Sequence, residues 1–113
     1  VPVLDLRYKG SSKIIGDRAY SSNPKIVSEI GDICISHFHN NKIGTIIKHI
    51  PGHGRAEVDS HKRLPKIDSC LEDLSSREFN PFIQLRFAAA AMTGHLLFPK
   101  LDLKKVSGPG LCD

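Results

Sequence analysis

The residues of this 113-residue sequence that could do chemistry gather between positions 48 and 61. The stretch opens with Lys-His-Ile-Pro-Gly-His-Gly at 48–54 and closes with Asp-Ser-His at 59–61. A carboxylate close to an imidazole can hold the tautomer of the ring and raise its basicity, so Asp59 and His61 form a candidate acid/base pair. By spacing alone such a pair is common, and a hydrogen-bonded surface or core histidine is the usual alternative.

A metal site is another candidate, because His49, His53 and His61 could supply three imidazole nitrogens. His49 and His53 would share one face only on a helix, and Pro51 followed by a glycine interrupts any helix there. We therefore expect no metal. A phosphate-binding loop is also disfavoured, because the glycines at 52 and 54 lack the later glycine and the following helix that such a loop needs.

Two strands and one helix are predicted in the first half of the chain. The apolar run at 3–6 follows a proline and predicts a strand, with Asp5 near its end. Asn23 followed by proline is a helix start, and isoleucines at helical spacing extend the predicted helix over 24–39. The β-branched stretch 43–50 predicts a buried strand that carries its polar residues at the C-terminal end.

The second half begins with a long loop at 51–68, where glycine, proline and charged residues dominate. Ser69 with Glu72 three residues later could form a capping box, and Asn80 before a proline repeats the cap signature, so a broken helix is expected. The small apolar stretch 88–97 is predicted as a third strand, against the alternative of continued helix that its alanines favour.

This order of strands and helices is typical of right-handed parallel βαβ units. The C-terminal ends of the predicted strands carry Asp5, Lys48, His49 and His95, and such ends converge on the active-site face in α/β barrels. A complete barrel needs about 250 residues. We therefore predict an α/β fold in which the whole chain, 1–113, is a fragment of one (β/α)8 TIM-barrel domain, with about three parallel strand/helix units.

The motif at 48–61, with Leu-Pro at 64–65, closely resembles the signature of family 3 glycoside hydrolases of the bacterial β-N-acetylglucosaminidase type, cytoplasmic enzymes of peptidoglycan recycling. Pro-Val-Leu-Asp-Leu at 2–6 and Ile-Gly-Asp-Arg-Ala-Tyr at 15–20 are also similar to segments of that family. Ala-Met-Thr-Gly-His at 91–95 resembles its Met-Thr-Ala-His strand end, with glycine in place of the usual alanine.

The resemblance implies a retaining hydrolase of terminal N-acetyl-β-glucosaminides such as muropeptides. Arg18, Lys48 and His49 are then expected to bind the N-acetylglucosamine unit, although a surface ion pair with Asp17 or Glu29 is the alternative for Arg18. His61, paired with Asp59, is expected to be the general acid/base on a mobile loop. No cofactor and no membrane partner are expected, and a nucleic-acid partner is disfavoured by the absence of tryptophan and by only 6% aromatic residues.

A retaining mechanism also needs a carboxylate nucleophile, which this family carries on a later strand. The candidates Asp102 and Asp113 lack that strand context, so we expect the nucleophile to lie outside this chain. The only methionine is Met92, and a sequence that begins Val-Pro-Val is expected to be a piece of a longer reading frame.

Composition leaves two other classes open. Apolar residues make up 40% and charged residues 25%, with no apolar run near the ~20 residues of a membrane span, as is typical of soluble globular proteins. The net charge of +4, with basic pairs at 62–63 and 104–105 and Lys66, permits a polyanion-binding module. An inactive truncated remnant is the other alternative.

Three widely spaced cysteines are expected to be reduced, as in cytoplasmic proteins.

Overall fold

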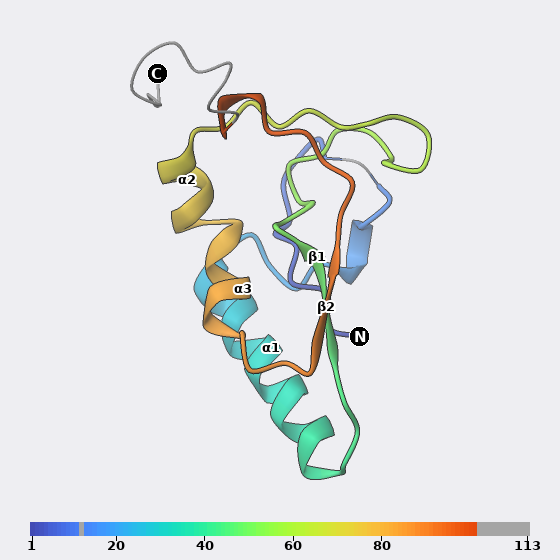
Figure 1. Cartoon of the computed structure of the whole chain (residues 1–113), viewed down its shortest axis with the longest axis vertical. Coiled ribbons are helices and arrows are strands. Elements are labelled where there is room, and N and C mark those ends of the chain that lie inside the picture. Colours follow the sequence, from blue (N-terminus) through green and yellow to red (C-terminus); the bar gives the residue numbers. More distant parts are fainter. Residues whose placement is uncertain (12, 102–113) are drawn as a thin grey trace.

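Two parallel strands with three helices along one side form the framework of the computed structural model, which describes residues 1–11 and 13–101 (Figure 1). Helix α3 packs against α1, α2 and β1. The N-terminal segment and the long loop after β1 lie toward the end where both strands finish. In chain order the elements are η1 (Gly16–Arg18), α1 (Pro24–Asn40), β1 (Ile46–Ile50), α2 (Leu71–Ser76), α3 (Phe79–Gln84), β2 (Ala90–Thr93) and η2 (Pro99–Leu101).

Helix α1 confirms the helix predicted from local signals. The Asn23 side chain accepts a hydrogen bond from the Lys25 backbone N–H at 2.9 Å, with proline as the first helical residue. The helix buries Val27, Gly31 and Ile35. A Cβ on Gly31 would lie 2.4 Å from Leu85 Cδ1, so this glycine lets α1 approach the end of α3 closely.

Strand β1 pairs in parallel with β2 from Ile46–Ala90 to Ile50–Thr93, with an irregularity in register before the last pair. On its other side β1 meets the N-terminal segment, where the Leu4 backbone N–H donates to the Lys48 carbonyl at 2.8 Å. The stretch predicted as a strand at 3–6 is therefore a single parallel bridge at Val3, not an extended strand. Beyond this bridge the contact continues through a side chain, because the His49 backbone N–H donates to the Asp5 carboxylate.

The predicted broken helix is confirmed as α2 and α3, but both predicted caps are wrong. Cys70 is the N-cap residue of α2 and makes no side-chain cap bond, while the Ser69 hydroxyl accepts a hydrogen bond from Arg55. Asn80 lies inside α3, whose N-cap is Glu78. The third predicted strand is present as β2, shorter than the predicted 88–97, and its pairing with β1 overrides the helix propensity of its alanines.

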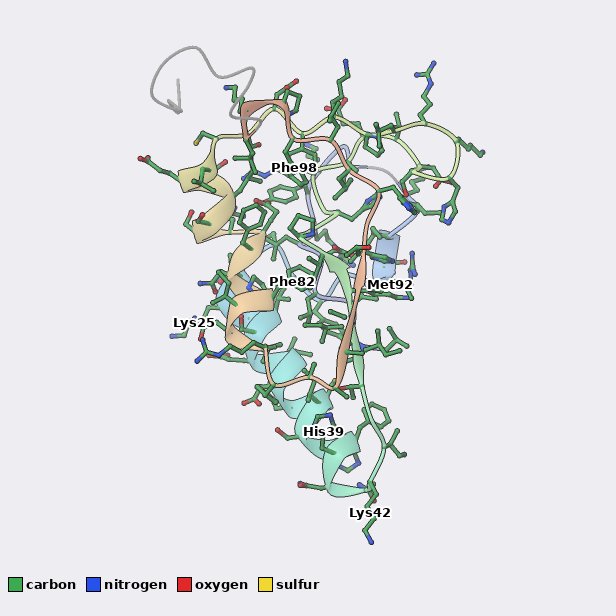
Figure 2. The ribbon with its side chains drawn as sticks, viewed as in Figure 1. Lys25, His39, Lys42, Phe82, Met92 and Phe98 are labelled. Carbon is green, nitrogen blue, oxygen red and sulfur yellow. The ribbon has the colours of Figure 1, made fainter. Side chains whose placement is uncertain are left out.

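The hydrophobic core lies between the N-terminal segment, α1, β1 and α3. Figure 2 shows Phe82 of α3 between the helix and the strands. All four residues of β2 are exposed, and Met92 keeps 45% of its surface in contact with solvent. The core cluster consists of Leu4, Leu6, Val27, Ile35, Ile47, Phe82 and Leu85.

The cysteines differ from the expectation that all three are reduced. Cys34 is free and half-buried, whereas Cys70 is disulfide-bonded. Wide separation in sequence does not keep thiols apart in a fold, so spacing was a poor guide. Cys112 lies outside the described residues. Among the helices of the described residues, none has both the length and the apolar character needed to cross a membrane.

Candidate active site

A pocket of about 500 Å³ lies where β1 and β2 end. Four segments of the chain line it, each through a residue singled out in the sequence: Arg18 of η1, Lys48 and His49 of β1, His61 of the long loop and His95 after β2. These residues are separated by up to 77 positions in the sequence, counted from Arg18 to His95. The parallel arrangement of the strands brings them to one side of the fold.

Asp5 is a buried carboxylate directly behind His49. Its Oδ2 lies 2.7 Å from His49 Nδ1, and its Oδ1 accepts the backbone N–H groups of His53 at 2.7 Å and His49 at 3.3 Å. The carboxylate is fully buried, while the His49 side chain remains 18% exposed. A carboxylate on Nδ1 selects the tautomer that carries its proton there, so Nε2 of His49 is the nitrogen left for a ligand.

His53 lies beside this pair and is 3% exposed. Its ring centroid is 5.9 Å from that of His49, and its Nδ1 has no hydrogen-bond partner among the described residues. Burial lowers the pKa of His53, and the neighbouring His49 lowers it further, although Asp5 opposes the shift. His53 is therefore a neutral imidazole at the back of the pocket.

Gly94 packs beside these two histidines. A Cβ on Gly94 would lie 3.4 Å from His49 Cβ and 3.6 Å from His53 Cδ2, which are ordinary packing distances. An alanine, the residue usual at this position in the family that the sequence resembles, would therefore fit here.

Asp59 and His61 form a local pair on the loop. Asp59 Oδ1 lies 2.8 Å from His61 Nδ1 and also accepts the His61 backbone N–H at 2.9 Å. These hydrogen bonds lower the pKa of Asp59, and the bond from the His61 backbone N–H has a larger effect than the bond to the ring. The His61 side chain is 82% exposed, so its free Nε2 edge is open to a ligand in the pocket.

The two cationic side chains of the site differ in their surroundings. Arg18 is exposed and donates to the backbone carbonyls of Ile14 and Ile15, while the neighbouring Asp17 pairs with Arg7 at 3.4 Å. Among the described residues, Arg18 forms neither of the ion pairs that the sequence left open, with Asp17 or with Glu29. Lys48 is half-buried in the middle of β1 and lines the pocket.

The set of groups suits recognition of a polar ligand and proton transfer to it. Lys48 and Arg18 can donate hydrogen bonds, His49 can accept one at Nε2, and His61 can exchange a proton. The described residues that line the pocket include no carboxylate. Within residues 1–11 and 13–101, no three His, Cys, Asp or Glu side chains gather closely enough to hold a metal ion.

Sequence reasoning missed the supporting residues of this site. Asp5 was expected at a strand end, but its three hydrogen bonds to residues 44 and 48 positions away were not. A signal was present, because a carboxylate inside the apolar run Val-Leu-Asp-Leu must be paired if it is buried. Arg55 and Glu78 carried no such signal, because each looked like an ordinary surface charge.

An α/β chain with imidazoles and cations at the carboxyl ends of parallel strands is typical of enzymes that act on small polar substrates. Residues 1–110 match the glycosyl hydrolase family 3 N-terminal domain. The chain therefore belongs to glycosyl hydrolase family 3.

Individual relatives agree with this assignment. The chain is 33% identical over 103 residues to a β-hexosaminidase of Hydrogenovibrio crunogenus, covering 89% of this chain and 29% of that protein. It is 32% identical over 108 residues to β-hexosaminidase A of Pseudoalteromonas piscicida, covering 93% of this chain and 18% of that protein. The chain thus spans less than a third of the length of these relatives.

Solved structures give the same result for the fold. NagZ from Neisseria gonorrhoeae, crystallised in complex with N-trifluoroacetyl-D-glucosamine, superposes with a TM-score of 0.84 at 33% identity, over 90% of this chain and 30% of that one. A family 3 β-N-acetylglucosaminidase from Paenibacillus sp. str. FPU-7 superposes with a TM-score of 0.83 at 34% identity, over 88% of this chain and 19% of that one.

Proposed function

We propose that this chain forms the acid/base half and part of the sugar-binding half of a retaining β-N-acetylhexosaminidase, which hydrolyses terminal N-acetyl-β-glucosaminides. The observation that carries the proposal is the pocket lined by Arg18, Lys48, His49 and His61. Membership of glycosyl hydrolase family 3 supports the reaction class. The N-acetylglucosamine analogue bound by the gonococcal NagZ supports the substrate class.

In the first step of this mechanism, a carboxylate outside these 113 residues attacks the anomeric carbon as the glycosidic C–O bond breaks. His61 donates its Nε2 proton to the departing oxygen, so the leaving group departs as an alcohol. Asp59 stabilises the protonated ring through Nδ1, which it contacts at 2.8 Å. Asp102 and Asp113, the carboxylates near the end of the sequence, lie outside the described residues and are not assigned this role.

In the second step, Nε2 of the neutral His61 ring carries no proton and takes one from water. The resulting nucleophile attacks the anomeric carbon and breaks its bond to the enzyme carboxylate, which restores both groups. Lys48, Arg18 and His49 hold the sugar through its hydroxyl groups and ring substituents during both steps. Because Asp5 keeps a proton on His49 Nδ1, His49 accepts a hydrogen bond from the sugar at Nε2.

The proposal extends to the parent fold and to the biological substrate. Parallel strands are usually covered on both faces, yet all four residues of β2 are exposed. Further strand/helix units of a (β/α)8 barrel would cover this strand. Muropeptides released during cell-wall recycling in the cytoplasm are the proposed natural substrates.

The test is a chimera in which this chain replaces the segment it matches in the Hydrogenovibrio crunogenus β-hexosaminidase. We expect the chimera to hydrolyse N-acetyl-β-glucosaminides. It should hydrolyse the matched β-glucosides, which lack the acetamido group, far more slowly. A folded chimera without hydrolysis would favour an inactive remnant and contradict the proposal. Salt-sensitive binding of polyanions in place of hydrolysis would favour the basic-module alternative, for which Lys62, Arg63 and Lys66 are exposed.

A further inference from the structure

Arg55 joins the two ends of the loop that carries Asp59 and His61. It lies near the start of the loop, and its Nη1 donates to Ser69 Oγ at 2.8 Å, across a separation of 14 residues. The same Nη1 lies 2.7 Å from Asp73 Oδ2 at the start of α2. One side chain therefore links the beginning of the loop to the residues with which the loop ends.

A buried carboxylate holds Arg55 in this position. Glu78, at the start of α3, is 1% exposed, and its Oε1 accepts a hydrogen bond from Arg55 Nε at 2.8 Å. The Tyr8 hydroxyl donates to the same oxygen, and the Arg55 guanidinium lies 5.1 Å from the centre of the Tyr8 ring. Burial opposes the charge on Arg55, but the hydrogen bonds to Glu78 and Asp73 raise its pKa.

The backbone just before Arg55 is also packed tightly. A Cβ on Gly52 would lie 2.7 Å from Glu78 Cβ, and a Cβ on Gly54 would lie 2.2 Å from the Leu6 carbonyl oxygen. At the far end of the loop, the Ile67 backbone N–H donates to the Leu97 carbonyl at 2.8 Å. Both ends of the loop are therefore fixed to the rest of the fold.

Between these ends, residues 56–64 are held by short-range hydrogen bonds. The Ala56 backbone N–H donates to the His53 carbonyl, and the N–H groups of Lys62 and Arg63 donate to the Asp59 carbonyl, each at 3.0 Å. The loop tip depends on where its ends are placed, because fixing the ends of a loop removes most of its accessible conformations. An arginine suits the task because its planar fork reaches several acceptors at once, which a lysine cannot do.

We propose that Arg55, held by Glu78, is a positioning residue that closes the base of the 56–64 loop and thereby keeps His61 at the mouth of the pocket. Its effect on catalysis rests on the proposed function, whereas its effect on the loop does not. Arg77 offers a matched control, because it also lies over the Tyr8 ring, at 5.4 Å, and donates to the Tyr8 hydroxyl and the Ser22 carbonyl. These contacts of Arg77 lie outside the loop.

The first arm measures backbone hydrogen exchange in the 113-residue chain itself. Arg55→Ala is expected to speed exchange in 56–64 about tenfold, because a buried charged hydrogen bond is lost. Exchange in α1 should stay within about twofold of its original rate, since that helix reports global unfolding. Arg55→Lys should give an intermediate effect, and Arg77→Ala should leave exchange in 56–64 unchanged.

Equal exchange rates in 56–64 for the unaltered chain and for Arg55→Ala would overturn the proposal. The same holds if these amides already exchange without protection in the unaltered chain. Equal acceleration in α1 would also overturn it, because Arg55 would then support the whole fold and not the loop. A loop effect of Arg77→Ala as large as that of Arg55→Ala would assign the role to the Tyr8 cluster in general and overturn the specific claim.

The second arm measures kcat/KM in the chimera. Arg55→Ala should lower kcat/KM about tenfold for a poor leaving group and less than about twofold for an activated aryl leaving group, since only the first needs a correctly placed acid. Equal losses for both substrates would overturn the positioning role. A chimera that is inactive with Arg55 intact would contradict the proposed function, and the exchange result would then decide the inference about the loop.

Discussion

The Asp5 carboxylate and the His49 ring, 44 residues apart, meet at 2.7 Å with the carboxylate fully buried. This contact connects the N-terminal segment to the end of β1 at the point where backbone pairing between them stops. It also selects the imidazole nitrogen that faces the pocket. The pair therefore lies at the end of a strand pairing and orients a histidine that lines the pocket.

Asp5→Asn tests that double role in the chimera. The substitution removes the carboxylate charge and introduces an amide that can donate to His49 Nδ1, so the ring should be misplaced. We expect kcat/KM to fall about 10- to 100-fold, as it does when a residue that orients a metal-ligating histidine is lost. Because the proposed contact of His49 is with the sugar and not with the leaving group, kcat/KM should fall by a similar factor for poor and activated substrates. Asp17→Asn is the control, since Asp17 is exposed and pairs with Arg7. Unchanged kinetics for Asp5→Asn would contradict the assignment.

Gly54 is expected to tolerate no side chain. A Cβ there would lie 2.2 Å from the Leu6 carbonyl oxygen, and backbone atoms cannot move aside cheaply. Gly54→Ala should lower the free energy of unfolding by about 1–3 kcal/mol, the usual range for overpacking. Gly44→Ala is the control, because its Cβ would meet only Ala89 Cβ at 3.6 Å. Urea unfolding of both variants measures the difference, and equal midpoints would refute the packing argument.

The lowered pKa of His53 predicts how stability depends on pH. The unfolded state takes up a proton near pH 6.5, whereas the folded state takes it up only at lower pH. Stability from this group is therefore complete above about pH 6.5 and falls as the pH drops toward the lowered pKa. Thermal unfolding between pH 7.5 and 5 should show this loss, and His53→Gln should reduce the pH dependence. A steeper dependence in the variant would mean that His53 is not the group responsible.

Lys48→Ala should act on sugar binding alone. Because the proposed contact of the Lys48 ammonium is with the sugar and not with the leaving group, kcat/KM in the chimera should fall by a similar factor for poor and activated substrates. The expected loss is about 10- to 100-fold for one charged hydrogen bond. A loss confined to poor leaving groups would place Lys48 in proton transfer and would contradict its assignment.

Local signals explain which parts of this structure could be predicted. Asn23 bonds a residue two positions away, and Asp59 contacts His61 at the same short range, so each appears as a sequence pattern. The prediction of a third strand was correct in type, because an apolar stretch that ends in polar residues indicates a strand. The predicted length was too long, because the pairing with β1 decides where β2 begins and ends.

The errors arise where distant residues compete for the same hydrogen bonds. Ser69 could not be recognised as a partner of Arg55, so it was predicted to cap a helix. Asp5 bonds the backbone N–H groups of His49 and His53, and these long-range partners cannot be read from the apolar run that predicts a strand at 3–6. Glu78 is charged and 1% exposed, a combination that no local pattern indicates. These contacts follow from the packing of the whole chain.

The central claim is that His61 transfers the proton, and the response of His61→Ala to the leaving group tests it most directly. In the chimera, kcat/KM for a poor leaving group should fall about 10²- to 10⁴-fold, the usual contribution of general acid catalysis. For an activated aryl leaving group, which departs without a proton, the loss should be below about tenfold. Asp59→Ala should show the same trend more mildly. Equal losses for the two leaving groups, or no loss for either, would contradict the account.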